Sequence, residues 1–504
     1  MTDLDAQARL ISGARFQPMR LTGRVVALRG MTVLVRDLPL PVGSLVMLRR
    51  DDAGARPSPE HLAATLSNAA DLGEVIGFDG ERSVVMMLAG TVQAGGGIRP
   101  GDRVVGLQAA QTISVSDAML GRVVNGLGRP IDGKGPIGGG AGSARLLEPE
   151  PIGPLQRRRI AEPMHTGVRA VDLFTTLGRG QRMGVFAGPG VGKSTLLGAI
   201  ARSASADVSV VGLIGERGRE VRDFIEHNLG EVGLKRSVVV AATGDESPLL
   251  RVRAAQAACA VAEYFRDRGK SVMLIMDSVT RFAHALRQVG LSTGEPPATR
   301  GYTPSVFAGL ARLLERAGAL ERTGPTSAAG GAATAGSITG LYSVLVEGDD
   351  MNEPIADAVR GILDGHLILS RTLAQRAHYP AIDVLDSVSR VADDVTDHAH
   401  QAARRQIVRL LALYKSVEDL LQIGAYARGA NPEADVAIDY HRAITEMLQQ
   451  NLSEPLGEGG APACFDQWRS QILKLAIQAG ADLQRASTVK ARPAQSVPTT
   501  GRRA

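Results

Sequence analysis

The sequence predicts an α/β protein with three folded parts: an N-terminal β-barrel, a central α/β core and a C-terminal helical domain. Short β-branched segments recur between residues 21 and 111 and are separated by Gly, Asp or Pro, which is typical of a small closed β unit. Farther along, near-continuous apolar segments of strand length alternate with helical stretches, which indicates a parallel sheet with helical crossovers. After residue 390 the pattern is helical.

The length and composition are those of a multidomain globular protein. A chain of 504 residues has room for about three domains of ~100–200 residues each. Aromatic residues make up only 3% of the chain, so few rings are available to stack on nucleic-acid bases. The two cysteines, Cys259 and Cys464, cannot form a disulfide framework, which fits a reducing compartment.

The charge distribution argues against a nucleic-acid partner. The net charge is +5, and residues 488–504 hold four basic residues and no acidic one, so the body of the chain is nearly neutral. No apolar run reaches the ~18 residues that a membrane span needs. The first residues lack the basic and then apolar pattern of a secretion signal. We therefore expect a soluble cytoplasmic protein.

Changes in composition suggest where the parts begin and end. Residues 51–70 interrupt the β pattern with a polar segment, and residues 317–335 are rich in Ala, Gly and Thr, so both are predicted loops. The leader is either a docking helix or a frayed terminus. The expected parts are the leader at 1–20, the β-barrel at 21–111, the α/β core at 112–390, the helical domain at 391–486 and a disordered tail at 487–504.

The strongest chemical signal is a glycine-rich turn between an apolar strand and a helix, in residues 183–197. Glycines let backbone N–H groups turn toward phosphate oxygens, and the N-terminus of the following helix favours an anion. Lys193 is expected to reach the β- and γ-phosphates, and the Ser194 hydroxyl to bind Mg²⁺. Ala187 stands where the strict pattern has Gly. The predicted phosphate-loop residues are Gly188, Pro189, Gly190, Val191, Gly192, Lys193, Ser194 and Thr195.

Two carboxylates follow apolar strands that lead to the same edge of the predicted sheet. Asp277 ends the strand at 272–277, where it either holds the Mg²⁺ shell or caps a helix; its pairing with the phosphate loop favours the metal role. Glu216 follows the strand at 208–214 and either orients an attacking water or forms a surface salt bridge. Together with the phosphate loop, these residues predict a nucleotide hydrolase.

Beyond these motifs, the chain resembles the catalytic subunits of rotary ATPases, and most closely the flagellar and type III secretion export ATPases. The resemblance runs over about residues 21–450, and it implies a RecA-like P-loop core, ATP as the nucleotide and Mg²⁺ as its metal. The segments that carry it include 121–130 (GRVVNGLGRP), 276–282 (MDSVTRF), 301–307 (GYTPSVF), 347–357 (EGDDMNEPIAD) and 380–389 (PAIDVLDSVS).

The resemblance also implies a role for each polar residue near the phosphates. Glu216 matches the catalytic carboxylate that positions water on the γ-phosphate. Arg217 and Arg281 match side chains that neutralise phosphate charge. Glu220 and Asp277 match groups of the Mg²⁺ water shell.

Two further matches imply that the protein works as a ring. Tyr379 matches the ring that stacks on adenine, although it could simply be a core residue. Arg390 matches the arginine finger that is offered to the neighbouring subunit's nucleotide, although a surface salt bridge is the plainer alternative. Such a finger is worth roughly 10³–10⁵ in rate in other enzymes. Its use in trans implies a homohexamer, and residues 349–354 resemble the loop that touches a central stalk.

The favoured function is an ATPase that energises export of flagellar proteins. The implied partners are a central stalk protein, a stator-like regulator, the export gate, export substrates and chaperones, with peripheral membrane association through these partners at the inner face of the membrane, and no nucleic acid.

Other functions stay open. They are a virulence-type secretion ATPase, a noncatalytic ring subunit, which the presence of Glu216 disfavours, and an RNA-translocating hexamer, which the single aromatic residue of 21–111, Phe78, disfavours. A proton-driven synthase is disfavoured because one chain type supplies both the carboxylate and the finger.

Overall fold

The computed structural model describes residues 21–49, 71–88, 97–108, 111–138, 142–321, 336–346, 348, 350–454, 456 and 460–490. The predicted leader and the predicted loop at 51–70 lie outside these ranges. The chain divides into two compact units. The first comprises residues 1–112 with the stretches 246–250 and 285–303, and the second comprises the remainder.

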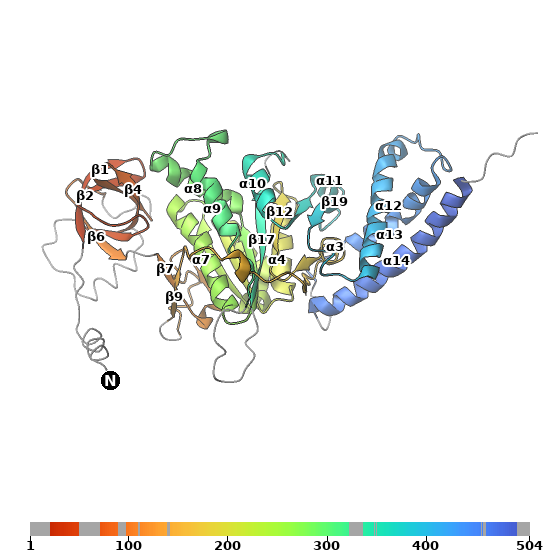
Figure 1. Cartoon of the computed structure of the whole chain (residues 1–504), viewed down its shortest axis with the longest axis horizontal. Coiled ribbons are helices and arrows are strands. Elements are labelled where there is room, and N and C mark those ends of the chain that lie inside the picture. The colour runs from red at the N-terminus through yellow and green to blue at the C-terminus, as the bar shows by residue number, and fades with distance from the viewer. Residues whose placement is uncertain are drawn as a thin grey trace, which may run out of the picture. The chain divides into compact units, whose positions relative to one another are not determined.

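The first unit contains a closed antiparallel barrel, as the sequence predicts (Figure 1). Its strands are β1 (Thr22–Arg29), β2 (Thr32–Arg36), β3 (Leu45–Arg49), β4 (Leu72–Asp79), β5 (Arg82–Met87) and β6 (Arg103–Gln108), in the order β1-β2-β5-β4-β3-β6. Valine side chains such as Val33, Val46 and Val85 fill the interior. Closure leaves no free strand edge, so the barrel satisfies its backbone hydrogen bonds by itself.

The second unit is built on a large β-sheet. Its strands are β8 (Val123–Val124), β12 (Arg182–Ala187), β13 (Val208–Glu216), β14 (Ser237–Thr243), β15 (Ser271–Asp277), β16 (Gly318–Ala319), β17 (Ser337–Leu345), β18 (Gly365–Leu369) and β19 (Ile382–Ser389). The order is β19-β18-β12-β17-β15-β13-β14-β8, with β16 beside β17. All neighbours run parallel except β19 and β16. The predicted parallel sheet with near-continuous apolar strands is confirmed.

Helices cover both faces of this sheet. They are α3 (Arg169–Phe174), α4 (Lys193–Ser203), α5 (Gly218–Asp223), α6 (Gly230–Lys235), α7 (Pro248–Arg266), α8 (Val279–Ser292), α9 (Pro304–Leu314), α10 (Pro354–Ile362) and α11 (Arg371–Gln375). Crossovers toward β14 and crossovers back toward β18 leave from opposite faces because each βαβ connection is right-handed. Figure 1 accordingly shows α4 on one side of the sheet and α7, α8 and α9 on the other.

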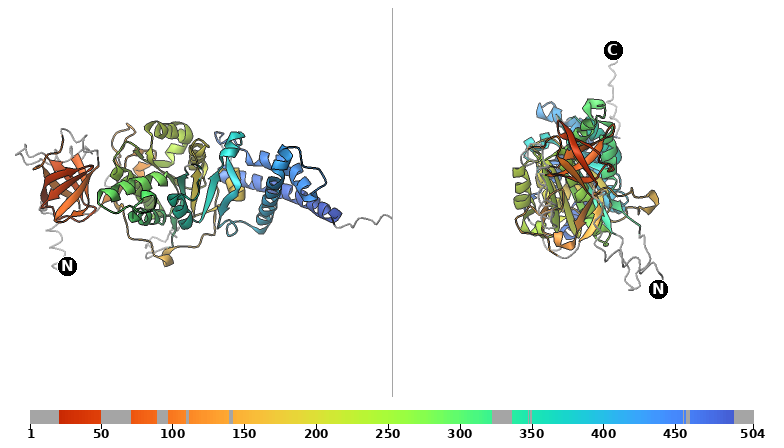
Figure 2. Two further views of the ribbon diagram at one scale, coloured as in Figure 1. Left: turned by 90° about the horizontal axis from the view of Figure 1, so that it is seen from above. Right: turned by 90° about the vertical axis from the view of Figure 1, so that its left-hand side faces the viewer.

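Three C-terminal helices pack side by side next to the β19 edge of the sheet (Figure 2). They are α12 (His398–Gln422), α13 (Pro432–Leu448) and α14 (Gly460–Lys490). Apolar residues of α14, among them Trp468 and Ile472, belong to the same core as the sheet. The fold class predicted from the sequence is therefore confirmed in all three of its parts.

Short elements complete the second unit. Strands β7 (Thr112–Val115) and β9 (Ser143–Leu146) form one small sheet, and β10 (Pro163–Met164) and β11 (Leu177–Gly178) form another. Short 3₁₀-helices are η2 (Asp117–Met119), η3 (Pro154–Gln156) and, in the first unit, η5 (Thr299–Gly301), and η4 (Phe224–Leu229) is a short π-helix.

The structure corrects one loop prediction and extends another boundary. Residues 317–335 were expected to be a loop throughout, but Gly318 and Ala319 form β16 and pair with Ile338 and Ser337 of β17. A strand of two residues has no sequence pattern of its own, so only its partner strand defines it. At the other end, α14 continues to Lys490, four residues into the segment 487–504 that was expected to be a tail.

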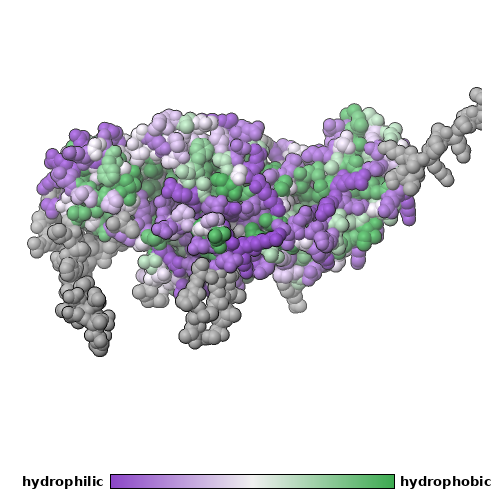
Figure 3. All heavy atoms as spheres, viewed as in Figure 1, coloured by the Kyte–Doolittle hydropathy of each residue, from purple (hydrophilic) through white to green (hydrophobic). Residues whose placement is uncertain are grey.

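On the face shown in Figure 3, hydrophilic residues predominate near the middle of the view, and exposed apolar side chains lie among them. Isolated apolar side chains at the surface are ordinary and need no partner. Within the described ranges, none of the helices combines the length and apolarity needed to cross a bilayer.

A buried ion pair joins α7 to the turn that follows α9. The Arg316 guanidinium donates to both carboxylate oxygens of Glu263, at 2.7 Å each, and to the carbonyl of Leu147 at 2.7 Å. Both side chains are about nine-tenths buried. Removing one partner of such a pair leaves an uncompensated buried charge, whereas replacing both with apolar residues does not.

We therefore expect Glu263→Leu to lower the free energy of unfolding by about 3–5 kcal/mol. The double substitution Glu263→Leu with Arg316→Met should recover most of that loss. Denaturant-induced unfolding of the three proteins measures this. A double variant no more stable than Glu263→Leu would show that the stranded charge is not the cause.

Candidate active site

The predicted phosphate loop connects β12 to α4 at the carboxyl edge of the sheet. Gly190 and Gly192 adopt φ of +79° and +91°, a backbone conformation that side chains rarely allow. Helix α4 begins at Lys193, and its first turn carries Ser194 and Thr195, which are both exposed. The free N–H groups of this helix start and the two hydroxyls make a site that suits an anion.

Lys193 and Asp277 meet directly beneath this loop. The Lys193 ammonium donates to Asp277 Oδ1 at 2.6 Å, and both side chains are largely buried, at 11% and 3% exposure. The Ser343 hydroxyl, from β17, donates to the same oxygen at 2.7 Å. Lys193 therefore lies at the phosphate loop, paired with the Asp277 carboxylate. When the ammonium binds phosphate instead, this carboxylate becomes available to a metal.

Glu216 reaches the same edge through a bulge in β13. The strand pairing slips between Ile214 and Glu216, and Gly215 has φ of +73°. The Arg281 side chain packs on Gly215, where an added Cβ would lie 2.9 Å from Arg281 Cδ. Arg281 Nε donates to Glu216 Oε1 at 3.1 Å. Only glycine at 215 leaves room for the arginine that holds Glu216.

The electrostatics of Glu216 set it apart from an ordinary surface carboxylate. Its pKa is raised to about 7, because burial disfavours the charged form and the negative charge of Asp277 lies nearby; the charges of Lys193 and Arg281 oppose this rise. A hydrogen bond to Glu220 also favours the protonated form. Near neutral pH this carboxyl group can hold a proton or release it.

Glu220 and Arg217 lie at the outer side of this cluster. Burial alone would raise the pKa of Glu220, but hydrogen bonds from Glu216 and from the Arg217 backbone lower it, so the pKa values of the two carboxyls are shifted in opposite directions. The Arg217 side chain is 81% exposed and lies 3.6 Å from the Glu220 carboxylate. Arg217 thus contacts the cluster from solvent.

A cavity of about 290 Å³ opens beside the phosphate loop. Val191, Gly192 and Thr195 line one side and Tyr379 with Pro380 another. The Tyr379 ring is 46% exposed, and a Cβ placed on Gly192 would lie 3.7 Å from it. A flat ring next to a phosphate loop suits a nucleotide base.

Residues after α13 complete this cavity: Gln450, Asn451, Leu452 and Ser453. The Gln450 N–H donates to the Tyr379 carbonyl at 2.9 Å, and its side-chain amide donates to the Gly167 carbonyl at 2.9 Å. The C-terminal helical part therefore contributes a wall to the base side of the site.

Arg390 lies at the opposite edge of the sheet. Strand β19 runs antiparallel to β18, and Ser389 pairs with Gly365 at the amino end of β18, whereas the phosphate loop follows the carboxyl end of β12. The six residues of β12 (Arg182–Ala187), which separate the two edges, span roughly 20 Å. The exposed Arg390 side chain is out of reach of its own phosphate loop.

The donor set fits a magnesium nucleotide. A hydroxyl at the helix start and nearby carboxylates are hard oxygen ligands, which Mg²⁺ prefers together with phosphates and water. In the described part of the chain no group of three or more His, Cys, Asp or Glu side chains could hold a metal ion unaided.

Two family models match the chain. The nucleotide-binding domain of the ATP synthase alpha/beta family matches residues 167–389, which include the phosphate loop, Glu216 and Asp277. The C-terminal domain of the type III secretion EscN ATPase matches residues 396–457.

Relatives along most of the chain decide the family. A flagellum-specific ATP synthase of Treponema pallidum (strain Nichols) is 48% identical over 87% of this chain and 91% of its own length. A type 3 secretion system ATPase of Xanthomonas euvesicatoria is 47% identical over 86% of this chain and 90% of its own. The chain belongs to this family of flagellar and type III secretion ATPases. The resemblance predicted from the sequence is confirmed, and the chain is an ATP-hydrolysing enzyme.

A solved relative has the same fold. The ATPase EscN of the enteropathogenic E. coli type III secretion system, in its assembled form, superimposes with a TM-score of 0.76 at 39% identity, covering 90% of this chain and 100% of EscN. EscN in complex with its central stalk EscO gives 0.75 at 38% identity, with the same coverage.

The structure brings together the predicted residues Lys193, Glu216, Glu220, Asp277 and Arg281, with Arg217 at the rim and Tyr379 at the base cavity. Their catalytic roles stay predictions of the family resemblance.

Sequence reasoning missed Gly215, Ser343 and the segment 450–453. Gly215 has a recognisable signal, a glycine just before a strand-terminal glutamate. Ser343 lies within an apolar strand and has none.

The raised pKa of Glu216 predicts that this residue lowers the stability of the fold in a pH-dependent way. In the unfolded chain this carboxyl ionises near 4.5, and in the fold at about 7, so the folded protein loses stability as pH rises through that interval. Without Mg²⁺ and nucleotide, Glu216→Gln should therefore stabilise the protein at pH 8, by up to about 3 kcal/mol. The advantage should shrink toward pH 5. Thermal unfolding from pH 5 to 8 measures it, and an advantage that grows on acidification would contradict the account.

Proposed function

We propose that this protein is a Mg²⁺-dependent ATP hydrolase that forms a ring and energises export of flagellar proteins through a type III secretion apparatus. One observation carries the catalytic part of this proposal: Lys193, Glu216 and Asp277 meet in one cluster under a phosphate loop. A lysine, a buried carboxylate with a raised pKa and a second carboxylate beside it are what phosphoryl transfer to water needs.

The residues divide the work by their positions. The N–H groups of the loop and of the α4 start bind phosphate oxygens, and Lys193, drawn from Asp277, neutralises charge on the γ-phosphate. Ser194 would bind Mg²⁺ directly, with Asp277 and Glu220 holding its water shell, and the bound metal would supply positive charge to the phosphates. Tyr379 stacks on the adenine.

Glu216 handles the attacking water. Its carboxylate accepts a hydrogen bond from that water and orients it toward the γ-phosphate, and its pKa near neutrality lets it take up the proton. Arg281 holds Glu216 in this direction through two donor contacts of 3.1 and 3.3 Å. Arg217, exposed at the rim, supplies further positive charge to the phosphates.

The placement of Arg390 supports a ring. Because this side chain lies at the sheet edge opposite its own phosphate loop, a finger role requires a second copy of the chain. EscN has been solved in an assembled form, and also with its central stalk EscO. We propose a homohexamer in which each Arg390 reaches the nucleotide of its neighbour, around a central stalk protein.

The further partners follow from the same proposal. They are a stator-like regulator, the export gate, export substrates and chaperones. Through these partners the cytoplasmic ring associates with the inner face of the membrane. Nucleic acid is not among them: Phe78 is the only aromatic residue of the described barrel strands, too few for a base-stacking platform.

Virulence-type secretion is the second candidate. Relatives with that name reach 47% identity, against 48% for a flagellar relative, so overall similarity does not separate the two systems. Deletion of the gene from its source organism distinguishes them. Loss of swimming motility supports the flagellar role, and retained motility with lost secretion of virulence proteins supports the other.

Turnover of purified protein tests the catalytic assignment. We expect Lys193→Ala and Glu216→Gln each to lower ATP turnover by at least about 100-fold, because each removes a group that acts on the γ-phosphate or its attacking water. Glu216→Gln should still bind ATP. Lys235→Ala, an exposed lysine at the end of α6, is the matched control and should turn over normally. Wild-type turnover in either site variant would refute the assignment.

A further inference from the structure

The turn that carries Arg390 is held by Asp364, the residue just before β18. The Arg390 N–H donates to the Asp364 carbonyl at 3.0 Å, and the adjacent residues Ser389 and Gly365 pair across β19 and β18. Gly365 admits no side chain, since an added Cβ would lie 2.3 Å from the Val388 carbonyl oxygen. The position of the turn therefore depends on where Asp364 is held.

Asp364 is in turn fixed to the first residue of the phosphate-loop strand. The Arg182 guanidinium donates to both carboxylate oxygens, at 3.1 and 2.9 Å, and the Arg182 N–H donates to Oδ2 at 3.0 Å. The Asp364 N–H completes the connection by donating to the Arg182 carbonyl at 2.9 Å. Strand β12, which begins here, ends at the phosphate loop.

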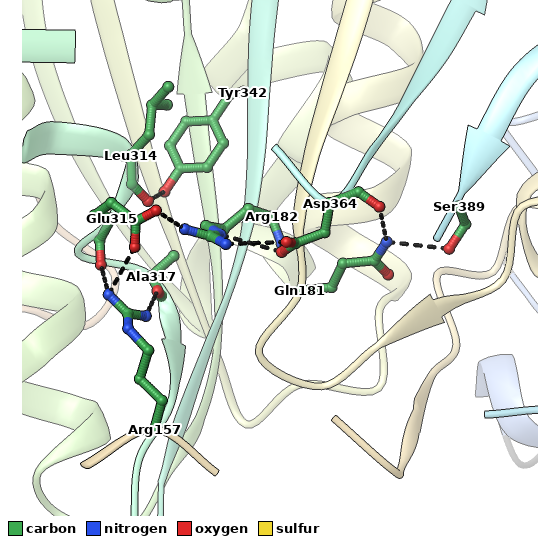
Figure 4. A network of polar contacts seen from close by, with 9 residues as sticks. All are labelled: Arg157, Gln181, Arg182, Leu314, Glu315, Ala317, Tyr342, Asp364 and Ser389. Atoms are coloured by element: carbon green, nitrogen blue, oxygen red, sulfur yellow. Dashed lines mark hydrogen bonds and ion pairs between the residues drawn. The ribbon is translucent and has the colours of Figure 1, made fainter. Parts of the chain in front are cut away.

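The Gln181 side chain contacts both sides of this turn. It is fully buried, with 0% exposure. Its amide NH₂ donates to the Asp364 carbonyl at 3.2 Å and to the Ser389 hydroxyl at 3.0 Å, and its oxygen accepts from the Gly178 N–H at 2.9 Å. Figure 4 shows Gln181 between Asp364 and Ser389. Because both ends of this buried amide are hydrogen-bonded, the network fixes the position of Gln181 relative to Asp364 and Ser389.

Arg182 also contacts Glu315 and, through it, Arg157 on its other side, away from the turn that carries Arg390. Glu315 pairs with Arg182 and Arg157, and Arg157 also donates to the Ala317 carbonyl at 3.0 Å (Figure 4). The Glu315 side chain is 47% exposed. Glu315 offers a matched control, because it shares the network but lies on the far side of Arg182 from the turn.

We propose that Gln181 is a positioning residue for Arg390. It fixes the Asp364–Ser389 turn to β12, so the strand that carries a subunit's own phosphate loop also sets the finger that the subunit offers to its neighbour. The inference rests on the proposed role of Arg390 in trans. A misplacement of about 1 Å can cost on the order of 100-fold in rate, so loosening the turn should slow hydrolysis without affecting ATP binding.

The test combines Gln181→Glu with Arg390→Ala. Gln181→Glu keeps the shape but replaces the two donors to Asp364 and Ser389 with an acceptor. In the assembled enzyme we expect kcat to fall by about 10- to 100-fold, with KM and the affinity for a fluorescent ATP analogue within about twofold of wild type. The double variant should be no slower than Arg390→Ala alone, because Gln181 acts only through Arg390. Glu315→Gln should keep the wild-type kcat.

Ser389→Ala, which removes one partner of the Gln181 amide, is the second variant if Gln181→Glu does not fold, and it should show the same pattern. A double variant slower than Arg390→Ala by the full factor of Gln181→Glu would show a merely structural role and overturn the inference. Normal kcat in both Gln181→Glu and Ser389→Ala, with a slow Arg390→Ala, would overturn it while leaving the proposed function intact. Normal kcat in Arg390→Ala would refute the finger itself and the inference with it.

Discussion

The parallel register of β12, β13 and β15 is the constraint on which the rest of the structure depends. Because the three strands end at one edge, residues far apart in the chain meet there: Lys193 after β12, Glu216 at the end of β13 and Asp277 at the end of β15. Burial then determines how the charges of these three side chains affect one another. Lys193 and Asp277 neutralise each other, while Glu216, close to the Asp277 charge and shielded from water, is left with a pKa of about 7. A small error in register would separate these groups.

Strand β19 gives the same subunit two different tasks. Tyr379 precedes it at the carboxyl edge, beside the subunit's own phosphate loop, and Arg390 follows it at the amino edge. One strand therefore connects the base side of a subunit's own site with the residue proposed to serve its neighbour. The antiparallel orientation of β19 in an otherwise parallel sheet makes this possible, since a parallel edge strand would carry its two ends in the opposite order.

The sequence predicted what local patterns encode. The phosphate loop, the carboxylate-terminated strands and the barrel could be read directly, because each follows from a period or a spacing within a short segment. Ser343 could not be predicted, since only the pairing of β15 with β17 places its hydroxyl on Asp277. The wall formed by residues 450–453 depends on how α13 packs, and the two-residue β16 on its partner strand. Long-range strand pairing accounts for two of these omissions and helix packing for the third, and neither leaves a local mark in the sequence.

The central claim is that each hydrolytic site combines the cluster of one subunit with Arg390 of another, and a mixing experiment tests it most directly. Lys193→Ala subunits lack a working phosphate loop but keep the finger, and Arg390→Ala subunits lack the finger but keep the loop. The account predicts that each variant alone hydrolyses ATP poorly and that assembly of the two together restores turnover, because mixed interfaces contain one intact loop and one intact finger. A mixture as inactive as either variant alone would contradict it.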